Sequence, residues 1–343
     1  MFYIHQISCI SPQQTFSEAD LDILHESVEY KMIIKEPAYE KIPPGIIRRM
    51  GKAVRIGVGA ALPLMKNDPD GIIIGTANGG IEDCVKFLNQ IVKYDEGTLT
   101  PGDFVQSTPN AIAAQLALLN SNKGYNMTHV HSGLAFENAI IDADMMLGEN
   151  PENSYLLGAV DEISNFNYNI DRLAGWYKQE DFKNTDLYRS NSPGSIAGEG
   201  AAMFIINNSK EKAKAKLQAV LTLNSIDETV LKEQMKNFLQ KNLSGEIDLF
   251  LSGENGDTRF SKYYNTCESV VENKTTLARF KHMSGEYATS SGTALWLACH
   301  ILETQKIPEH MIKRSVESKQ INNILIYNCF KGEQHSFILV SKA

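Results

Sequence analysis

Short apolar runs alternate with stretches of helical spacing along both halves of this chain, and this alternation limits its fold more than any other feature. Gly71 to Gly75 (GIIIG) is a β-branched run bounded by glycines, which is typical of a strand buried on both faces. Asn110 to Leu119 is rich in Ala and Leu and follows Pro109, a favoured residue in a first helical turn. Strands that alternate with helices in this way predict an α/β protein with largely parallel sheets.

The same two patterns continue to the end of the chain. Helical spacing predicts helices over residues 50–65, 133–146, 230–243 and 292–302, and apolar runs predict strands over 126–130, 155–160, 201–206, 217–223, 247–251, 324–327 and 336–340. The length of 343 residues suggests two domain-sized units, because single cores rarely grow past about 250–300 residues. We place the boundary after Asn208, which gives halves of residues 1–208 and 209–343. The lysine-rich stretch that follows, SKEKAKAK, also fits an ordinary solvated turn or helix.

The composition is that of a folded, acidic protein. Hydrophobic residues make up 43% of the chain, which is enough for a buried core and excludes a disordered chain. Lys and Arg number 33 against 41 Asp and Glu, and no basic arm or stripe offsets this balance, so we expect no nucleic-acid partner. The longest apolar runs are too short to span a bilayer and the first residues lack the pattern of a signal peptide, so we expect a soluble protein.

The cysteines indicate the compartment. There are five, none of them in a C-x-x-C pair: Cys9, Cys84, Cys267, Cys299 and Cys329. An odd, sparse set in a chain of this size favours reduced thiols, so we expect a cytoplasmic protein.

Three short patterns could carry chemistry, and each has a simpler interpretation. The glycines between Gly75 and Gly80 match neither of the two glycine spacings that bind phosphate, G-x-G-x-x-G and G-x-x-x-x-G-K-[ST]. A tight turn after a strand is therefore the favoured interpretation. His129 and His131 would lie on one face of a strand, but no third metal ligand can be chosen, so we expect no metal. Ser132 resembles the serine of a nucleophile elbow, yet Val130 stands where G-x-S-x-G needs glycine. A helix N-cap is the favoured role for Ser132.

Eight further segments occur in a fixed order along the chain. They are Arg48-Arg49-Met50 with Gly75-Thr76 and Gly79-Gly80, Ser107-Thr108-Pro109-Asn110 with Ala113-Ala114, Thr128 to Gly133 (THVHSG), Gly158 to Asp161 (GAVD), Gly198 to Ala201 (GEGA), Ser252-Gly253, Lys281 to Glu286 (KHMSGE) with Gly292, and Asn328-Cys329-Phe330. In this order, over nearly the whole length, the chain resembles a β-ketoacyl-acyl carrier protein synthase of the thiolase-like fold. The resemblance implies two similar α/β halves that form a layered αβαβα body with mostly parallel or mixed sheets.

The same alignment shows that the catalytic residues of that family have changed. The position of the acyl-accepting cysteine is Val130, and the positions of the two catalytic histidines are Ser252 and Glu286. Lys281 matches the family lysine, and its simplest role is an ion pair with Glu286. A shift of one residue would instead bring His129 or His131 to the nucleophile position. A gap would bring His282 to the second histidine position, but the ungapped fit keeps more of the motif and is preferred.

The resemblance therefore implies a catalytically degenerate ketosynthase subunit, a pseudoenzyme for condensation. We expect it to act like a chain-length factor, the inactive partner of an active ketosynthase, in polyene, polyketide or fatty-acid-type biosynthesis. Chains of this kind resemble those of aryl-polyene and flexirubin-type pathways. The implied partners are an active ketosynthase in a heterodimer, or a second copy in a homodimer, together with an acyl carrier protein. We expect no cofactor, and the sequence leaves open whether any enzymatic activity remains.

Two other functions stay open on the same fold. One is an acyltransferase or thioester hydrolase with a rearranged site, for which His131, Ser132 and Lys281 are the candidate residues. The other is a homodimeric protein that only binds acyl chains. Phe104, Phe136 and Phe330 are candidates for the lining of a substrate pocket, although ordinary core packing would also account for the first two.

Overall fold

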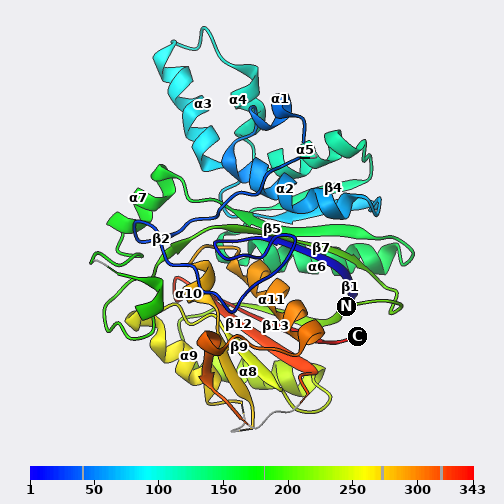
Figure 1. The fold of residues 1–343 in the computed structure, drawn as a ribbon, viewed down its shortest axis with the longest axis vertical. Coiled ribbons are helices and arrows are strands. Elements are labelled where there is room, and N and C mark those ends of the chain that lie inside the picture. Colours follow the sequence, from blue (N-terminus) through cyan, green and yellow to red (C-terminus); the bar gives the residue numbers. More distant parts are fainter. Residues whose placement is uncertain (41, 181, 272–273, 317–319) are drawn as a thin grey trace.

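Two β-sheets of matching topology form the framework of the computed structural model, which describes residues 1–40, 42–180, 182–271, 274–316 and 320–343 (Figure 1). The strands form one continuous ladder of eleven in the order β11-β10-β9-β12-β13-β8-β1-β7-β5-β3-β4. At the pairing of β1 with β8 this ladder divides into a first sheet, β4-β3-β5-β7-β1, and a second sheet, β11-β10-β9-β12-β13-β8. The strands of the first are β1 (Tyr3–Ile10), β3 (Gly71–Gly75), β4 (Tyr125–His129), β5 (Tyr155–Asp161) and β7 (Gly200–Asn207). Those of the second are β8 (Ala215–Asn224), β9 (Leu249–Ser252), β10 (Thr276–Arg279), β11 (Ile312–Arg314), β12 (Asn323–Phe330) and β13 (Gln334–Lys342).

The five strands of the first sheet correspond to five of the second, and β11, antiparallel to β10, is an additional edge strand of the second. In the first, β3 lies parallel to β4 and β5, while β7 is antiparallel to both β5 and β1. In the second, β9 lies parallel to β10 and β12, while β13 is antiparallel to both β12 and β8. Two residue pairs, Tyr3 with Lys216 and Ile4 with Ala215, join β1 to β8. The expectation of two similar α/β halves is confirmed. The proposed boundary after Asn208 falls in the turn between β7 and β8 and stays a prediction.

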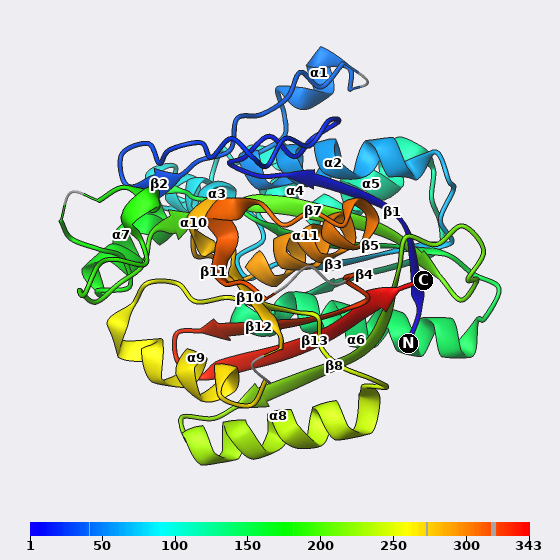
Figure 2. The same cartoon turned by 60° about the horizontal axis from the view of Figure 1, so that its bottom comes forward.

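Helices lie in three layers around these sheets, as Figure 2 shows. The outer helices of the first half are α2 (Lys52–Met65) and α5 (Ala111–Asn120), and those of the second half are α8 (Glu228–Asn242) and α9 (Ser261–Glu268). Between the sheets lie α6 (Ala135–Glu149) and α11 (Ser290–Thr304). Three apolar clusters fill the spaces between successive layers, and the body is therefore the expected αβαβα sandwich.

Shorter elements complete the chain. Helices α3 (Ile81–Lys93) and α4 (Pro101–Gln106) form a hairpin that projects from the body (Figure 1), and α7 (Asn165–Leu173) lies at one end of the first sheet. The others are α1 (Pro44–Ile47), α10 (Lys281–Ser284), the single turns η1 (Ser132–Leu134), η2 (Asn184–Asp186), η3 (Thr258–Phe260) and η4 (Glu309–Met311), and the strand pair β2 (Lys31–Met32) and β6 (Ala197–Gly198). No helix in the described part of the chain has the length and apolar character needed to cross a membrane.

Candidate functional site

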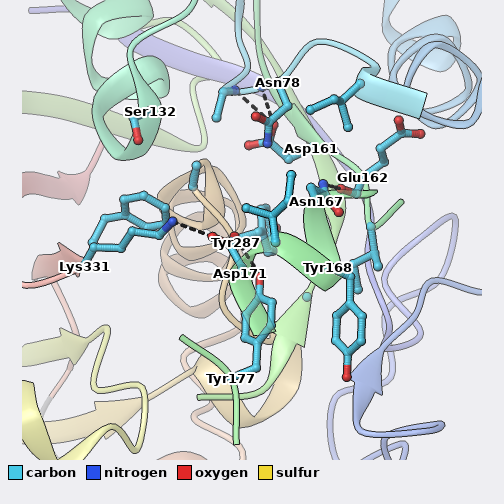
Figure 3. A pocket seen from close by; sticks show the side chains of 17 residues that line it. Asn78, Ser132, Asp161, Glu162, Asn167, Tyr168, Asp171, Tyr177, Tyr287 and Lys331 are labelled. Carbon is cyan, nitrogen blue, oxygen red and sulfur yellow. Dashed lines mark hydrogen bonds and ion pairs between the residues drawn. The ribbon is translucent and has the colours of Figure 1, made fainter. Parts of the chain in front are cut away.

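A pocket of about 310 Å³ lies where the carboxyl ends of four strands meet (Figure 3). Its walls come from the segments that follow β3, β4, β5 and β12, represented by Asn78, Ser132, Glu162 and Lys331, and from helix α7. Ligands of α/β proteins bind outside the carboxyl ends of parallel strands, because the loops of neighbouring strands converge there. This pocket is therefore the candidate functional site.

Asp161, at the end of β5, ties the pocket wall to the central helix α11. Its buried carboxylate accepts hydrogen bonds from the N–H of Ala77 at 2.9 Å and from the hydroxyl and N–H of Thr289 at 2.8 and 3.1 Å. Burial raises the pKa of Asp161, although these donors oppose the change. With all its contacts on the protein, Asp161 positions the surrounding loops and is not a free reactive group.

Glu162 follows and joins two helix N-termini. Its carboxylate accepts from the N–H of Ala53 in α2 at 2.9 Å and from the N–H of Glu82 in α3 at 3.4 Å. The partial positive charge of the two helix ends favours the ionised form. Burial dominates, however, and raises the pKa of Glu162 to about 7. The pocket therefore carries a carboxyl group that titrates near neutral pH.

Val130 does not reach the pocket. The residue follows β4, and its side chain is 48% exposed on the surface of the chain. His131 is also exposed, whereas Ser132 lines the pocket with its backbone in the left-handed region at φ 49°. The expected N-cap role of Ser132 is wrong, because neither η1 nor α6 has a side-chain cap. A residue at positive φ has turned away from the extended geometry that an N-cap adopts.

Gly133 brings the turn after β4 against the end of β12. A Cβ atom at Gly133 would lie 2.3 Å from the Cβ of Phe330, so a larger residue has no room there. The N–H of Gly133 also donates to the side chain of Gln334 at 2.8 Å. The close approach places the ring of Phe330 in the pocket wall.

His129 pairs with a neighbouring helix. Its Nε2 lies 2.9 Å from the carboxylate of Asp142 in α6, which also accepts from the hydroxyl of Tyr125 at 3.1 Å. The described residues contain no group of three or more His, Cys, Asp or Glu side chains placed to hold a metal ion. Strand β4 ends at His129, so His131 lies beyond it and the two residues do not share a strand face as the sequence pattern suggested.

Lys281 and Glu286 form a buried ion pair, as expected from the alignment. The Lys281 Nζ lies 2.7 Å from one Glu286 oxygen and 2.5 Å from the Ser290 hydroxyl, and the other Glu286 oxygen accepts from the Asn255 amide at 2.8 Å. The Lys281 side chain is fully buried and that of Glu286 is 10% exposed. The turn between them needs Gly285, which has φ +71°. Every charged atom of this pair is occupied by the protein.

The side chains at the other aligned positions are also buried and hydrogen-bonded within the protein. Ser252 is fully buried at the end of β9, where its hydroxyl accepts from the N–H of Glu254 at 3.2 Å. Both ring nitrogens of His282 are engaged, one by the Tyr188 hydroxyl at 3.2 Å and the other by His310 Nδ1 at 2.8 Å. Burial lowers the pKa of His282 to about 3, so the ring is neutral. His282 thus has no nitrogen available for chemistry in the pocket.

The three aromatic candidates lie in different places. Phe330 lines the pocket, whereas Phe136 is buried in the central core against Phe204, with ring centroids 5.9 Å apart. Phe104 is 57% exposed on α4 and packs against Phe87. In this chain Phe136 is therefore a core residue, and Phe104 belongs to the surface of the projecting hairpin.

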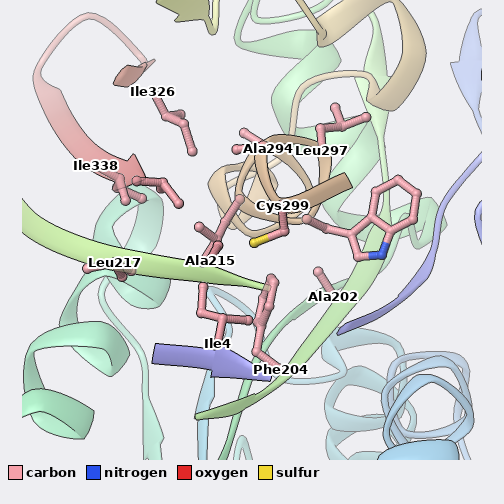
Figure 4. Close-up of a cluster of buried hydrophobic side chains, with 14 of the residues drawn as sticks. Ile4, Ala202, Phe204, Ala215, Leu217, Ala294, Leu297, Cys299, Ile326 and Ile338 are labelled. Carbon is pink, nitrogen blue, oxygen red and sulfur yellow. The ribbon is translucent and has the colours of Figure 1, made fainter. Parts of the chain in front are cut away.

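The cysteines lie outside the described pocket lining. Cys299 points into the apolar cluster between the sheets (Figure 4), and burial raises its pKa to about 12. Cys9 and Cys329 are also buried, with pKa values raised to about 12. A thiol in such surroundings stays protonated and is a poor nucleophile. The described residues therefore offer no thiolate to accept an acyl group in this pocket.

The structure adds site residues that the sequence patterns missed. Asp171 of α7 pairs with Lys331 across the pocket at 2.7 Å, and Tyr177 approaches the same carboxylate at 3.5 Å (Figure 3). Asp171 and Lys331 are 160 residues apart, and no local spacing links them. None of the segments named in the sequence analysis includes either residue.

Comparison with known proteins supports the resemblance. Residues 26–172 match the family model of the beta-ketoacyl synthase N-terminal domain. No curated protein matches the chain. A solved structure of a beta-ketoacyl synthase from Burkholderia phymatum STM815 is similar with a TM-score of 0.79 and 12% identity, covering 100% of this chain and 99% of that one.

Two similar structures contain chain length factors. The ishigamide ketosynthase/chain length factor has a TM-score of 0.78 and 12% identity, covering 100% of this chain and 99% of the other. The ketosynthase ApeO in complex with its chain length factor ApeC, from Xenorhabdus doucetiae, has a TM-score of 0.73 and 13% identity, covering 100% and 98%. At these identities the structures share the fold, which is the thiolase-like fold of ketosynthases.

Proposed function

We propose that this chain is a non-condensing β-ketoacyl synthase homologue that acts like a chain length factor, as the partner of an active ketosynthase. The observation that carries the proposal is the ion pair of Lys281 and Glu286 at a position where the family uses a histidine. A carboxylate there repels the negative charge that develops in acyl transfer, whereas a histidine would stabilise it. Val130 supplies no nucleophilic atom, so two separate requirements for condensation fail.

The surface around β4 supports a subunit partner. Among the described strands, β4 pairs only with β3, so its other edge presents free backbone N–H and C=O groups. Folded proteins cover or block such edges, because an open edge pairs readily with another strand. Large apolar side chains surround this edge and are exposed on the single chain: Leu118 of α5, Met127 of β4, Val130 after it, and Ile141 and Met145 of α6. An apolar patch along a free edge fits strand pairing with a second subunit.

The identity of that subunit rests on the relatives. One similar structure holds a ketosynthase with its chain length factor, and another is a type II polyketide acyl-carrier protein in complex with its ketosynthase. We infer a heterodimer with a ketosynthase that receives its substrate from an acyl carrier protein. Polyene, aryl-polyene, polyketide and fatty-acid-type pathways are the proposed settings, and the cytoplasm is the proposed location.

A rearranged acyl-transfer site is less well supported. Lys281 is occupied by Glu286 and Ser290 and does not line the pocket, whereas Ser132 does. No hydrogen bond joins Ser132 to His131 or to another base among the described side chains. An unactivated serine is a weak nucleophile.

Co-expression with a ketosynthase encoded beside this chain tests the proposal. The pair should elute as one complex, and light scattering should give the mass of one copy of each chain. Met127→Asp puts a charge on the β4 patch and should abolish the complex, whereas the matched control Leu173→Asp, at an 88% exposed residue of α7, should leave it intact. A homodimer that resists both substitutions, or no complex together with condensation of malonyl units by the isolated chain, would refute the proposal.

A further inference from the structure

Helix α7 covers the pocket as a separate wall. Four lining residues belong to it: Asn167, Tyr168, Ile170 and Asp171. A capping box fixes its first turn, since the hydroxyl of Ser164 accepts from the N–H of Asn167 at 3.2 Å and the Asn167 side chain accepts from the N–H of Ser164 at 2.9 Å. The beginning of α7 is therefore held to the end of β5.

The rest of α7 is only weakly packed. Tyr168 is the single buried residue of this nine-residue helix, whereas Ile170 is 63% and Leu173 is 88% exposed. The helix ends at Leu173, and Gly175 just beyond it has φ +75°. Segments with few buried apolar contacts open at low free energy compared with the core of the same protein. The contacts at the distal end of α7 therefore decide how often it leaves the pocket.

Side chains from outside the helix hold this distal end. Arg259 donates to the carbonyl of Gly175 at 2.8 Å and Gln179 to that of Arg172 at 2.9 Å, and the ion pair comes from the turn between β12 and β13. Lys331 and Gly332 both have positive φ, at 52° and 74°, which projects the Lys331 side chain across the pocket. Its Nζ lies 2.7 Å from the Asp171 carboxylate, and both side chains are partly exposed, 33% for Lys331 and 24% for Asp171. The same Nζ stands 5.1 Å over the ring of Trp176, just beyond α7. Lys331 thus contacts both the helix and the segment behind it. Figure 3 shows its pair with Asp171.

We propose that α7 is a hinged lid over the pocket and that the Lys331–Asp171 ion pair is the latch that holds it closed. The capping box at Ser164 is the fixed end, and Gly175, at φ +75°, is the position where the backbone can bend at the other end. When the pair separates, α7 swings away and takes with it four residues of the pocket wall, which exposes Asp161 and Glu162 to larger ligands. The proposal concerns access to the pocket and holds whether or not this chain pairs with a ketosynthase.

Hydrogen–deuterium exchange of the full-length chain, read on peptides that cover residues 163–176, measures lid opening. Lys331→Met removes the charge and should speed exchange in α7 by about two- to fivefold, the range for a partly exposed ion pair. In the unmodified chain, raising the salt from about 0.05 M to about 1 M should have a similar effect, because it screens the pair, and in Lys331→Met it should have little. The matched control is Lys274→Met. This substitution breaks an exposed ion pair with Glu246, distant from α7 in the sequence, and should leave the exchange rate of α7 unchanged.

A charge swap separates a latch from a general packing role. The double variant Lys331→Asp/Asp171→Lys restores an ion pair with the positive and negative side chains exchanged. It should return the exchange rate of α7 to that of the unmodified chain. Peptides from the buried strand β7 should be unchanged in every variant, which shows that the fold is intact. Unchanged α7 exchange in Lys331→Met, no recovery in the swapped variant, or equal acceleration in β7 would each overturn the proposal.

Discussion

Removal of Lys281 should destabilise the fold more than removal of any exposed cation. Lys281→Met leaves the Glu286 carboxylate buried, with the Asn255 amide as its remaining hydrogen-bond partner in place of a full positive charge. Breaking a buried ion pair by deleting one partner costs about 3–5 kcal/mol, because the other charge stays uncompensated. An unfolding entropy of about 2.1 cal/mol/K per residue converts this loss for the whole chain into a drop in Tm of about 4–7 °C.

Deletion of both partners should cost less than deletion of one. The double variant Lys281→Met/Glu286→Leu leaves no buried charge, so its free energy of unfolding should exceed that of Lys281→Met alone. Thermal melts followed by circular dichroism, together with urea titrations, give the three values. Lys183→Met is the control, since its pair with Glu26 is more than half exposed on both sides and should contribute at most about 1 kcal/mol.

The reasoning fails on either of two results. A loss below about 1 kcal/mol in Lys281→Met would show that Glu286 is not held by this lysine. A double variant less stable than Lys281→Met would show that the two side chains contribute independently. In both cases the ion pair would not be what replaces the catalytic histidine.

Three further outcomes follow from the buried groups. Burial lowers the pKa of His282 to about 3 and of His335 to about 4. As the pH falls, these histidines are therefore protonated in the unfolded chain at a higher pH than in the folded chain. Stability is then complete above about pH 6.5 and should fall as the pH drops toward 4 in urea titrations. Burial raises the pKa of Glu137, which accepts from the Ser336 hydroxyl at 2.7 Å, so Glu137→Gln should raise the free energy of unfolding at pH 7 and have less effect at pH 5. Val130→Cys alone should not start condensation, measured as carbon dioxide released from a malonyl thioester, because no histidine assists the new thiol.

Much of the framework could be predicted from local patterns. The run of isoleucines in β3 and the apolar residues of α11 reflect full burial on all sides, because buried positions are mostly occupied by apolar residue types. The Lys281–Glu286 pair could also be predicted, because both residues fall within one short ungapped motif five positions apart. These features share one property: their cause lies within a few residues of their position.

The remaining features depend on contacts between distant segments. No prediction covered α3 or α7, because each has only one buried residue and therefore carries a weak core pattern. The capping role predicted for Ser132 was wrong, because packing of Gly133 against Phe330 on a strand far along the chain sets the turn. The Lys331–Asp171 pair likewise joins two halves of the body. Such geometry follows from the assembled layers and has no local signature.

The release of carbon dioxide from malonyl-loaded carrier protein tests the central claim most directly. Three samples are compared at equal concentration: this chain alone, the co-expressed ketosynthase alone, and the purified pair. Our account predicts no release above background from this chain alone and condensation by the purified pair. Met127→Asp, which should abolish the complex, should reduce the release to that of the ketosynthase alone. Sustained release by this chain alone, which has Val130, Ser252 and Glu286 at the aligned positions, would contradict it.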